Sequence, residues 1–155
     1  MPNWCNNHIT LRHENPGVIE AVVAAANKDE FFNTFVKRPE EKEEDWYSWN
    51  IENWGTKWEP SFWEEAVIND PNEVVLGFDT AWAPPIKFYE ALVEQGFFVD
   101  AFYYEPGMNF CGRFADGCDE YIEIEGDSDW VDEFVPEEIN ECFAISENMR
   151  DWESE

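Results

Sequence analysis

The chain has 155 residues, of which 36 are acidic and nine are basic, and its net charge is −27. Such a charge excludes direct binding to nucleic acid, because phosphates repel carboxylates. A disordered acidic chain is excluded as well, since 44% of the residues are hydrophobic and 17% are aromatic. We therefore expect a single folded domain over residues 1–155 that buries a core beneath an acidic surface.

The sequence contains no sign of export. It does not open with a basic segment followed by an apolar run, and no stretch approaches the roughly 18 apolar residues of a membrane span. A location in the cytoplasm is therefore expected. In that compartment the four cysteines, Cys5, Cys111, Cys118 and Cys142, are expected to be reduced thiols that pack as small apolar groups.

Hydrophobic periodicity predicts a strand and a helix at the start of the chain. Residues 5–13 alternate between two faces, which is typical of a β-strand. Asn15 and Pro16 then supply the N-cap and first-turn proline of a helix that Asn27 closes. The short apolar run 31–36 favours a second strand.

A tryptophan-rich segment follows a charged connection. Five of the nine tryptophans fall within residues 46–63. Helical spacing places four aromatic and aliphatic residues on one stripe, between a cap at Asp45 and a stop at Gly55. The stripe consists of Tyr47, Ile51, Trp54 and Trp58. We expect it to pin a helix onto the core; a surface that stacks against a ligand is the alternative.

The middle of the chain alternates between helix and strand signals. Residues 61–69 are expected to form a short helix, and a turn at residues 70–72 leads into strand 73–81. This strand is apolar on both faces at its start, as a central strand should be. Two prolines, Pro84 and Pro85, then open a helix that Gly96 ends.

The last third begins with strands. An aromatic strand is expected over residues 97–104, and strands 109–115 and 118–125 should form a hairpin about the Asp116-Gly117 turn. Pro136 is expected to open a helix that turns Ile139, Cys142 and Phe143 inward, after which order should fade.

This order of elements predicts an α+β fold of the ferredoxin-like type. It contains the split β-α-β pattern, with an antiparallel sheet and helices on one face. Two additions are expected: a tryptophan-rich helical region inserted at about residues 38–72, and an acidic C-terminal extension, residues 116–155, that adds a hairpin and a helix.

Four collinear blocks resemble a known family. They are MPNWCNNHIT, WYSWNIENWGTKW, FDTAWAPP and YYEPGMNFCGRF, and together they resemble the YubB-like proteins of plasmids and phages. The resemblance covers roughly residues 1–115 and implies a ferredoxin-like domain in a mobile-element protein of the bacterial cytoplasm. It implies no catalytic residue.

The residues do not point to an enzyme. His8 and His13 are the only histidines, and an offset of five on a strand sends them to opposite faces. No nucleophile elbow, P-loop, dinucleotide fingerprint or HExxH motif occurs. Cys5 and His8 fit no standard zinc spacing, and the acidic segment 127–133 lacks the glycine of a calcium loop. We therefore expect no catalytic residue, metal or cofactor.

Charge is the more informative signal. Residues 116–155 hold sixteen acids and one base, Arg150. The net charge of −27 equals that of about 45 Å of duplex DNA, and a compact domain of this length is about 40 Å across. The charge thus predicts a DNA mimic that occupies the basic groove of a nucleic-acid-handling protein. The resemblance to mobile-element proteins implies that this partner is a host defence protein, of restriction or CRISPR type. The predicted contact acids are Asp116, Asp119, Glu120, Glu123, Glu125, Asp127, Asp129, Asp132, Glu133, Glu137, Glu138 and Glu141.

Three alternatives remain open at this stage. The acids can form an evenly spread, solvated coat, as charge runs usually do. The chain can be a protein-interaction module that uses exposed aromatics such as Trp49, Trp63 or Trp82. It can also be an enzyme or small-ligand binder, which should show a pocket with convergent polar groups. The oligomeric state is not predicted.

Overall fold

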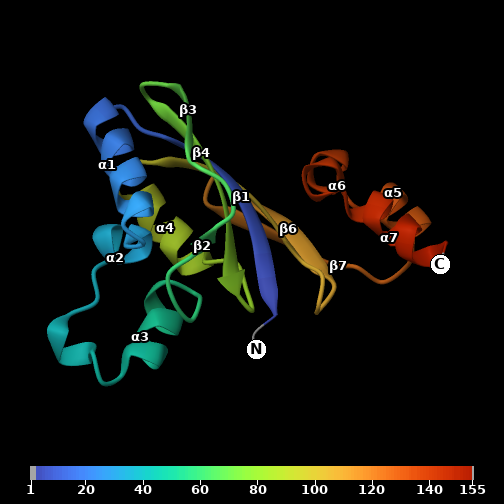
Figure 1. Cartoon of the computed structure of the whole chain (residues 1–155), viewed down its shortest axis with the longest axis horizontal. Helices are drawn as coiled ribbons and strands as arrows, with labels where there is room; N and C mark the ends of the chain where they lie inside the picture. The colour runs from blue at the N-terminus through green and yellow to red at the C-terminus, as the bar shows by residue number, and fades with distance from the viewer. Residues whose placement is uncertain (1–2, 155) are drawn as a thin grey trace.

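A seven-stranded antiparallel sheet and seven α-helices make up the computed structural model, which describes residues 3–154 (Figure 1). The strands are β1 (Trp4–Arg12), β2 (Ser61–Phe62), β3 (Val67–Asp70), β4 (Glu73–Ala81), β5 (Phe98–Glu105), β6 (Phe110–Ala115) and β7 (Cys118–Glu123). The helices are α1 (Pro16–Asn27), α2 (Phe31–Phe35), α3 (Trp46–Asn53), α4 (Ile86–Glu94), α5 (Ser128–Phe134), α6 (Glu137–Phe143) and α7 (Ile145–Glu153), and a short 3₁₀ helix, η1, covers Glu40–Lys42.

The strands follow the order β2-β4-β1-β5-β6-β7, with β3 also paired to β4. Strand β1 is central: Ile9 lies opposite Leu76 of β4 on one side and Ala101 of β5 on the other. Strand β4 has partners on both sides, which confirms its prediction as an interior strand. The sheet therefore ends in β2 and β3 at one edge and in β7 at the other.

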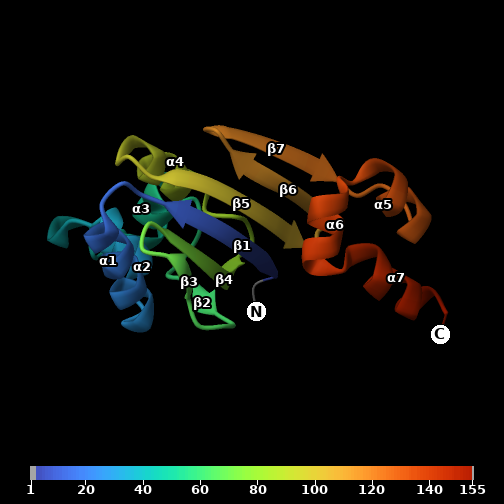
Figure 2. The same cartoon turned by 90° about the horizontal axis from the view of Figure 1, so that it is seen from above.

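Helices cover both faces of the sheet, whereas the sequence predicted helices on one face (Figure 2). Ala101 of β5 packs with the main core, while the next residue, Phe102, packs with the cluster formed by α5, α6 and α7. Successive side chains of a strand point to opposite faces. The C-terminal helices thus lie on the face opposite α1 and α4, so the one-face arrangement predicted for the ferredoxin-like core does not extend to these added helices.

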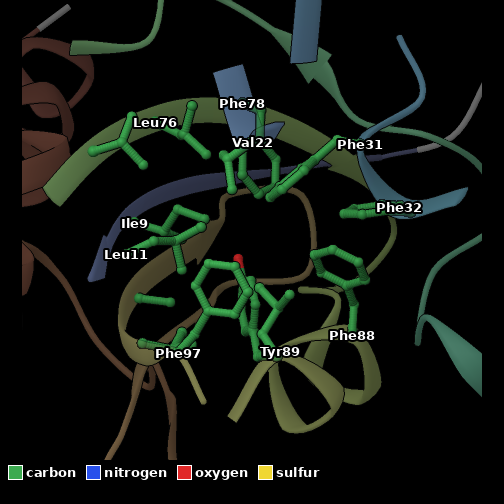
Figure 3. Close-up of a cluster of buried hydrophobic side chains, with 14 of the residues drawn as sticks. Ile9, Leu11, Val22, Phe31, Phe32, Leu76, Phe78, Phe88, Tyr89 and Phe97 are labelled. Carbon is green, nitrogen blue, oxygen red and sulfur yellow. The ribbon is translucent and has the colours of Figure 1, made fainter. Parts of the chain in front are cut away.

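The main core lies between the sheet and helices α1, α2 and α4, and it is rich in phenylalanine (Figure 3). The ring of Phe31 lies within 5.0 to 6.2 Å, centre to centre, of five other aromatic rings. Tyr89 is fully buried, and its hydroxyl donates to Oδ1 of Asn7 at 3.3 Å. Asn7 in turn donates to Thr80 at 2.9 Å, so the polar groups inside this core are paired.

Helix α2 occupies the segment that the sequence predicted as a second strand. The carboxylate of Glu59 accepts the backbone N–H groups of Phe32 at 2.7 Å and Asn33 at 2.9 Å. These are N-terminal amides that have no partner within a helix. The cap comes from a residue 27 positions away, so a distant contact overrode the local pattern and the strand prediction was wrong.

Helix α3 has the predicted bounds but presents a different face to the core. It begins after Asp45, and Gly55, with a φ of 85°, follows its end. Tyr47 and Ile51 are 49% and 40% exposed, however, while Trp54 is buried and donates its indole N–H to the Val36 carbonyl at 2.9 Å. The prediction that the Tyr47 stripe faces the core was therefore wrong for its first two members.

The segment after Pro60 forms strands β2 and β3, where the sequence predicted a helix. Phe62 pairs with Phe78, and Val67 pairs with Val75. Without these partners the outer backbone groups of β4 would lack hydrogen bonds. Hydrogen bonding to β4 thus outweighed the local pattern of this segment, which favours a helix.

The β6–β7 hairpin forms at the predicted turn. Asp116 and Gly117 have φ angles of 53° and 76°, and Cys118 pairs with Ala115. Positive φ at both central residues is the geometry of a type I′ turn.

Replacing Gly117 by alanine is expected to lower the free energy of unfolding by about 1 to 2 kcal/mol, because an L side chain is strained at this φ. A Cβ at Gly117 would meet nothing within 4 Å, so the loss would come from backbone conformation alone. Urea denaturation measures it. Asp116→Asn is the control and should leave stability unchanged, since asparagine tolerates the left-handed region. A Gly117→Ala variant as stable as the parent would contradict the turn geometry.

The C-terminal extension is ordered beyond the single helix that was predicted. Asp127 accepts the backbone N–H of Trp130 at 3.1 Å and caps α5. Ala144, with a φ of 50°, separates α6 from α7. Ile139 is buried as expected, but Cys142 is exposed. Over residues 3–154, no helix is long and apolar enough to cross a membrane.

Candidate functional site

All twelve predicted contact acids are exposed. They follow the chain from the β6–β7 turn along β7 and through α5 into α6. Beneath them lies a second hydrophobic cluster, in which Ile122 of β7 packs against buried residues that include Ile124, Val131 and Ile139. This one cluster holds β7, α5 and α6 together. We call their exposed acids, together with those of the adjoining turns, the acidic surface; on β7 these acids project from both faces of the strand.

Strand β7 forms the outer edge of the acidic surface. It pairs with β6 and, among the described residues, with no other strand. Asp119 and Glu123 share one face with Tyr121 between them, while Glu120 points to the other face. Strand β7 ends at Glu123, so Glu125, predicted as a strand residue, lies beyond the strand.

Some acids of the surface already have partners within the fold. Asp119 accepts the hydroxyl of Tyr103 at 2.6 Å, and both this bond and burial raise the pKa of Tyr103 above its usual range. Glu138 lies 3.4 Å from Arg113, whose guanidinium also binds both carboxylate oxygens of Asp100. These acids are consequently less available to an outside partner.

Arg150 of α7 joins two acids of α5. Its guanidinium lies 3.5 Å from Asp129 and hydrogen-bonds Asp132. The hydrogen bond from Arg150 is the largest cause of the lowered pKa of Asp132, followed by that from Ser146. The single cation of the extension is thus used internally to attach α7 to α5.

This contact predicts how stability responds to pH. A lowered folded-state pKa means that the ionised form of Asp132 stabilises the fold at pH values above its unfolded pKa. That contribution is lost as the pH falls through the lower, folded pKa. Arg150→Gln should raise the pKa of Asp132 toward the ordinary aspartate value, which an NMR titration of the carboxyl carbon measures. Arg12→Gln, at the end of the central strand β1 where it pairs with Glu73 of β4, is the control and should leave that titration unchanged. An unaltered Asp132 pKa in Arg150→Gln would contradict the contact.

Seven of the twelve acids remain without an ion pair or side-chain hydrogen bond among residues 3–154. They are Asp116, Glu120, Glu123, Glu125, Glu133, Glu137 and Glu141. Both arginines near the surface, Arg113 and Arg150, are bound to other carboxylates. The field of these seven acids is therefore not neutralised by a neighbouring free cation, and it extends into solvent over about one Debye length.

Exposed aromatic side chains are a second candidate feature. Of the three tryptophans predicted for such a patch, Trp63 and Trp82 are 47% and 49% exposed, while Trp49 is half-buried and packs against Trp54. Trp82 has a φ of 71°, an unusual backbone conformation for a bulky residue that costs roughly 1 to 3 kcal/mol. Sequence periodicity did not predict the exposure of Tyr47 and Ile51.

Groups for metal chemistry do not converge among the described residues. In the part of the chain that the structure describes, no three His, Cys, Asp or Glu side chains lie close enough to hold a metal ion. His13 accepts the backbone N–H of Asn15 at 3.0 Å, beside the start of α1. Burial raises the pKa of Asp79 on β4, and its buried Oδ1 has no hydrogen-bond partner. The environment of Asp79 thus differs from that of a surface carboxylate.

Comparison with known proteins adds no relative from which a role can be transferred. No protein-family model, curated protein or solved structure matches the chain. The functional case therefore depends on the chain's own residues.

Proposed function

We propose that this protein is a DNA mimic, which binds the basic nucleic-acid groove of a bacterial defence protein and blocks it. One observation carries the proposal: seven exposed acids without partners lie on β7, α5, α6 and the turns beside them, and both nearby arginines are already bound to carboxylates. Such a surface offers a basic groove the same ligand chemistry as a phosphate backbone.

The physics of association supports this use. A groove built to bind DNA carries lysines and arginines, and a carboxylate surface pairs with those cations as phosphates do. Long-range attraction also speeds the encounter of oppositely charged surfaces. The net charge of −27 is large for 155 residues, and its self-repulsion opposes compactness. A role in binding explains the retention of this net charge better than a uniform solvated coat does.

The choice of a defence protein as target comes from the resemblance to YubB-like proteins of plasmids and phages. A mobile element enters a bacterium as foreign DNA, so a restriction enzyme or a CRISPR complex is the basic surface that it must avoid. On this proposal the protein acts in the host cytoplasm and is not an enzyme.

We further propose that part of the sheet is a ferredoxin-like core with additions. In support, α4 connects β4 to β5, and these two strands lie on either side of β1. The chain from β1 through α1 likewise leads to β2 and β3, which lie beyond β4. Both halves thus follow the split β-α-β pattern. Strands β6 and β7 and helices α5 to α7 are then the added elements that carry the acidic surface.

A second candidate, a protein-interaction module that acts through aromatics, is favoured by the exposure of Trp82 despite its costly φ of 71°. The two candidates differ in their salt dependence, because aromatic contacts persist at high salt whereas ion pairs are screened.

Capture of partners from bacterial lysate tests the proposal. The tagged protein is immobilised at low salt, eluted with a salt gradient, and the eluted proteins are identified by mass spectrometry. A basic nuclease or CRISPR component that elutes as salt rises, and that DNA competes off, is the expected result. A partner that stays bound at high salt and ignores added DNA would contradict mimicry and direct attention to Trp82.

A further inference from the structure

A pocket of about 510 Å³ lies where the start of α2 meets the α3 region. Three indoles line it: Trp54, which is buried; Trp58, which is half-buried; and Trp46, which is 38% exposed. Their exposure increases from Trp54, in the core, to Trp46. This pocket lies in the tryptophan-rich insertion and includes none of the twelve acids of the acidic surface.

The charges of the pocket favour a cation. Asp29, Glu30 and Glu59 contribute carboxylates, whereas Arg38 is the only basic residue in its lining. The guanidinium of Arg38 lies 3.1 Å from a carboxylate oxygen of Glu43 and donates to the Asn50 side chain at 3.0 Å. Its charge is therefore already compensated, and the pocket retains an excess of negative charge.

Glu59 occupies an unusual position within this pocket. Its two oxygens accept backbone N–H groups at the start of α2, and burial nevertheless raises its pKa. The ionised carboxylate is thus poorly solvated where it stands. An added cation would interact with it more strongly than with a fully hydrated acid.

The chain itself shows that these indoles contact cations. The guanidinium carbon of Arg38 lies 5.9 Å from the ring centre of Trp54, and the ammonium of Lys57 lies 4.4 Å from that of Trp58. Both distances are within the range of a cation–π interaction. Arg38 combines this contact with a carboxylate and an amide oxygen, which is the set of partners that a guanidinium prefers.

We propose that this pocket binds a guanidinium group, supplied by an arginine side chain of the partner. A guanidinium is planar and weakly hydrated, so it stacks on an indole and donates to carboxylates at the same time, whereas an ammonium is compact and strongly hydrated. That the guanidinium comes from an arginine of the partner rests on the proposed function, because DNA-binding grooves are lined with arginine. Recognition of a guanidinium by the pocket is independent of the proposed function.

The pocket gives an acidic protein a means of choosing among basic partners. Surface carboxylates accelerate association but discriminate weakly, while a side chain inserted into a desolvated aromatic pocket slows dissociation. The acidic surface would then set the rate of encounter, and the tryptophan pocket would set the residence time.

Binding of N-acetyl-L-arginine amide to the full-length protein tests the inference, observed through the indole N–H signals of the nine tryptophans by NMR. We expect the signals of Trp46 and Trp58 to shift at millimolar probe. N-acetyl-L-citrulline amide, which has the same shape without the charge, should not shift them. Trp46→Leu should weaken binding of the arginine probe about tenfold. Trp152→Leu, on α7 and 76% exposed, is the matched control and should bind as the parent does.

Equal shifts with the citrulline or the corresponding lysine probe would overturn guanidinium recognition, as would unaltered binding in Trp46→Leu. The outcome is separable from that of the proposed function. If the arginine probe binds but capture of the lysate partner does not depend on the acidic surface, mimicry fails and the pocket stands. If capture depends on the acidic surface and the probe does not bind, the pocket fails and mimicry stands.

Discussion

Reversing the charge of Glu120, Glu123, Glu133 and Glu137 together is expected to raise the Kd for the captured partner on the order of 100- to 1,000-fold at low salt. Each reversal removes an attraction and adds a repulsion against a basic groove. These four acids are exposed and make no ion pair or side-chain hydrogen bond among residues 3–154, so the fold does not depend on them. Asp129 and Asp132 are left unchanged because they bind Arg150.

The salt dependence provides the diagnostic measurement. For each lost contact, the slope of log K against log salt should fall by roughly 0.9, as it does for phosphate contacts. Titrations by fluorescence anisotropy at several salt concentrations measure both Kd and slope. Circular dichroism establishes that the variant remains folded.

A matched variant separates the acidic surface from net charge alone. Glu20, Glu41, Glu44 and Glu94 lie outside the extension, are exposed and make no ion pair or side-chain hydrogen bond within the described residues. Reversing these four alters the net charge by the same amount. We expect a change in Kd below about tenfold, because distant charges are screened. Equal losses in the two variants would mean that the acids act only as a uniform coat.

Replacing Phe31 by alanine is expected to lower the free energy of unfolding by about 3 to 5 kcal/mol. Its ring is fully buried and lies near Phe32, Phe35, Phe62, Phe78 and Phe88. These neighbours come from helices and strands on several sides, so they cannot close together around the missing ring. Since domains of this kind are stable by only about 5 to 15 kcal/mol, the loss would be a large share of the total.

Urea denaturation measures this effect as a lower unfolding midpoint of Phe31→Ala, while the slope of the free energy of unfolding against urea concentration stays unchanged. Phe134→Ala is the control: Phe134 is 57% exposed on α5, and its removal should cost less than about 1 kcal/mol. A loss below 1 kcal/mol for Phe31→Ala would show that the phenylalanine core is loosely packed at this point.

The interior of the sheet was predictable because its signals are local. Strand β1 alternates buried and more exposed residues along its whole length, and β4 has the predicted bounds, Glu73–Ala81. The turn at Asp116 and Gly117 needed only the chemistry of two adjacent residues. In each case the pattern that predicts the element lies within the element itself, although the strands pair with partners far along the chain.

Elements that depend on distant partners were not predictable in this way. Helix α2 is capped by Glu59, and β3 is stabilised by its pairing with β4. Helix α7 has few apolar residues, and its attachment through Arg150 and Glu153 involves residues of α5 more than fifteen positions away. The hydrophobic periodicity of a segment carries no information about partners elsewhere in the chain.

The candidate site was predictable as a set of exposed acids, but not in its details. A count of acidic and basic residues along the chain showed that the acids are concentrated in the extension. All twelve predicted contact acids are exposed. Which of them are free depends on Tyr103, Arg113 and Arg150, whose positions follow from the fold. A ligand-stacking surface in the tryptophan-rich segment was only the alternative prediction, because the helical stripe was expected to face the core, whereas Tyr47 and Ile51 face solvent.

The free edge of β7 has a consequence for the behaviour of the protein in acid. Its outer backbone groups pair with no strand among residues 3–154, and at neutral pH the neighbouring carboxylates keep other copies away. Near the isoelectric point of about 4.1 that repulsion vanishes while the unpaired amides and carbonyls remain. Acidified samples should therefore turn cloudy as chains join edge to edge into growing sheets. The edge that would bind a partner at neutral pH would then be the site where chains aggregate.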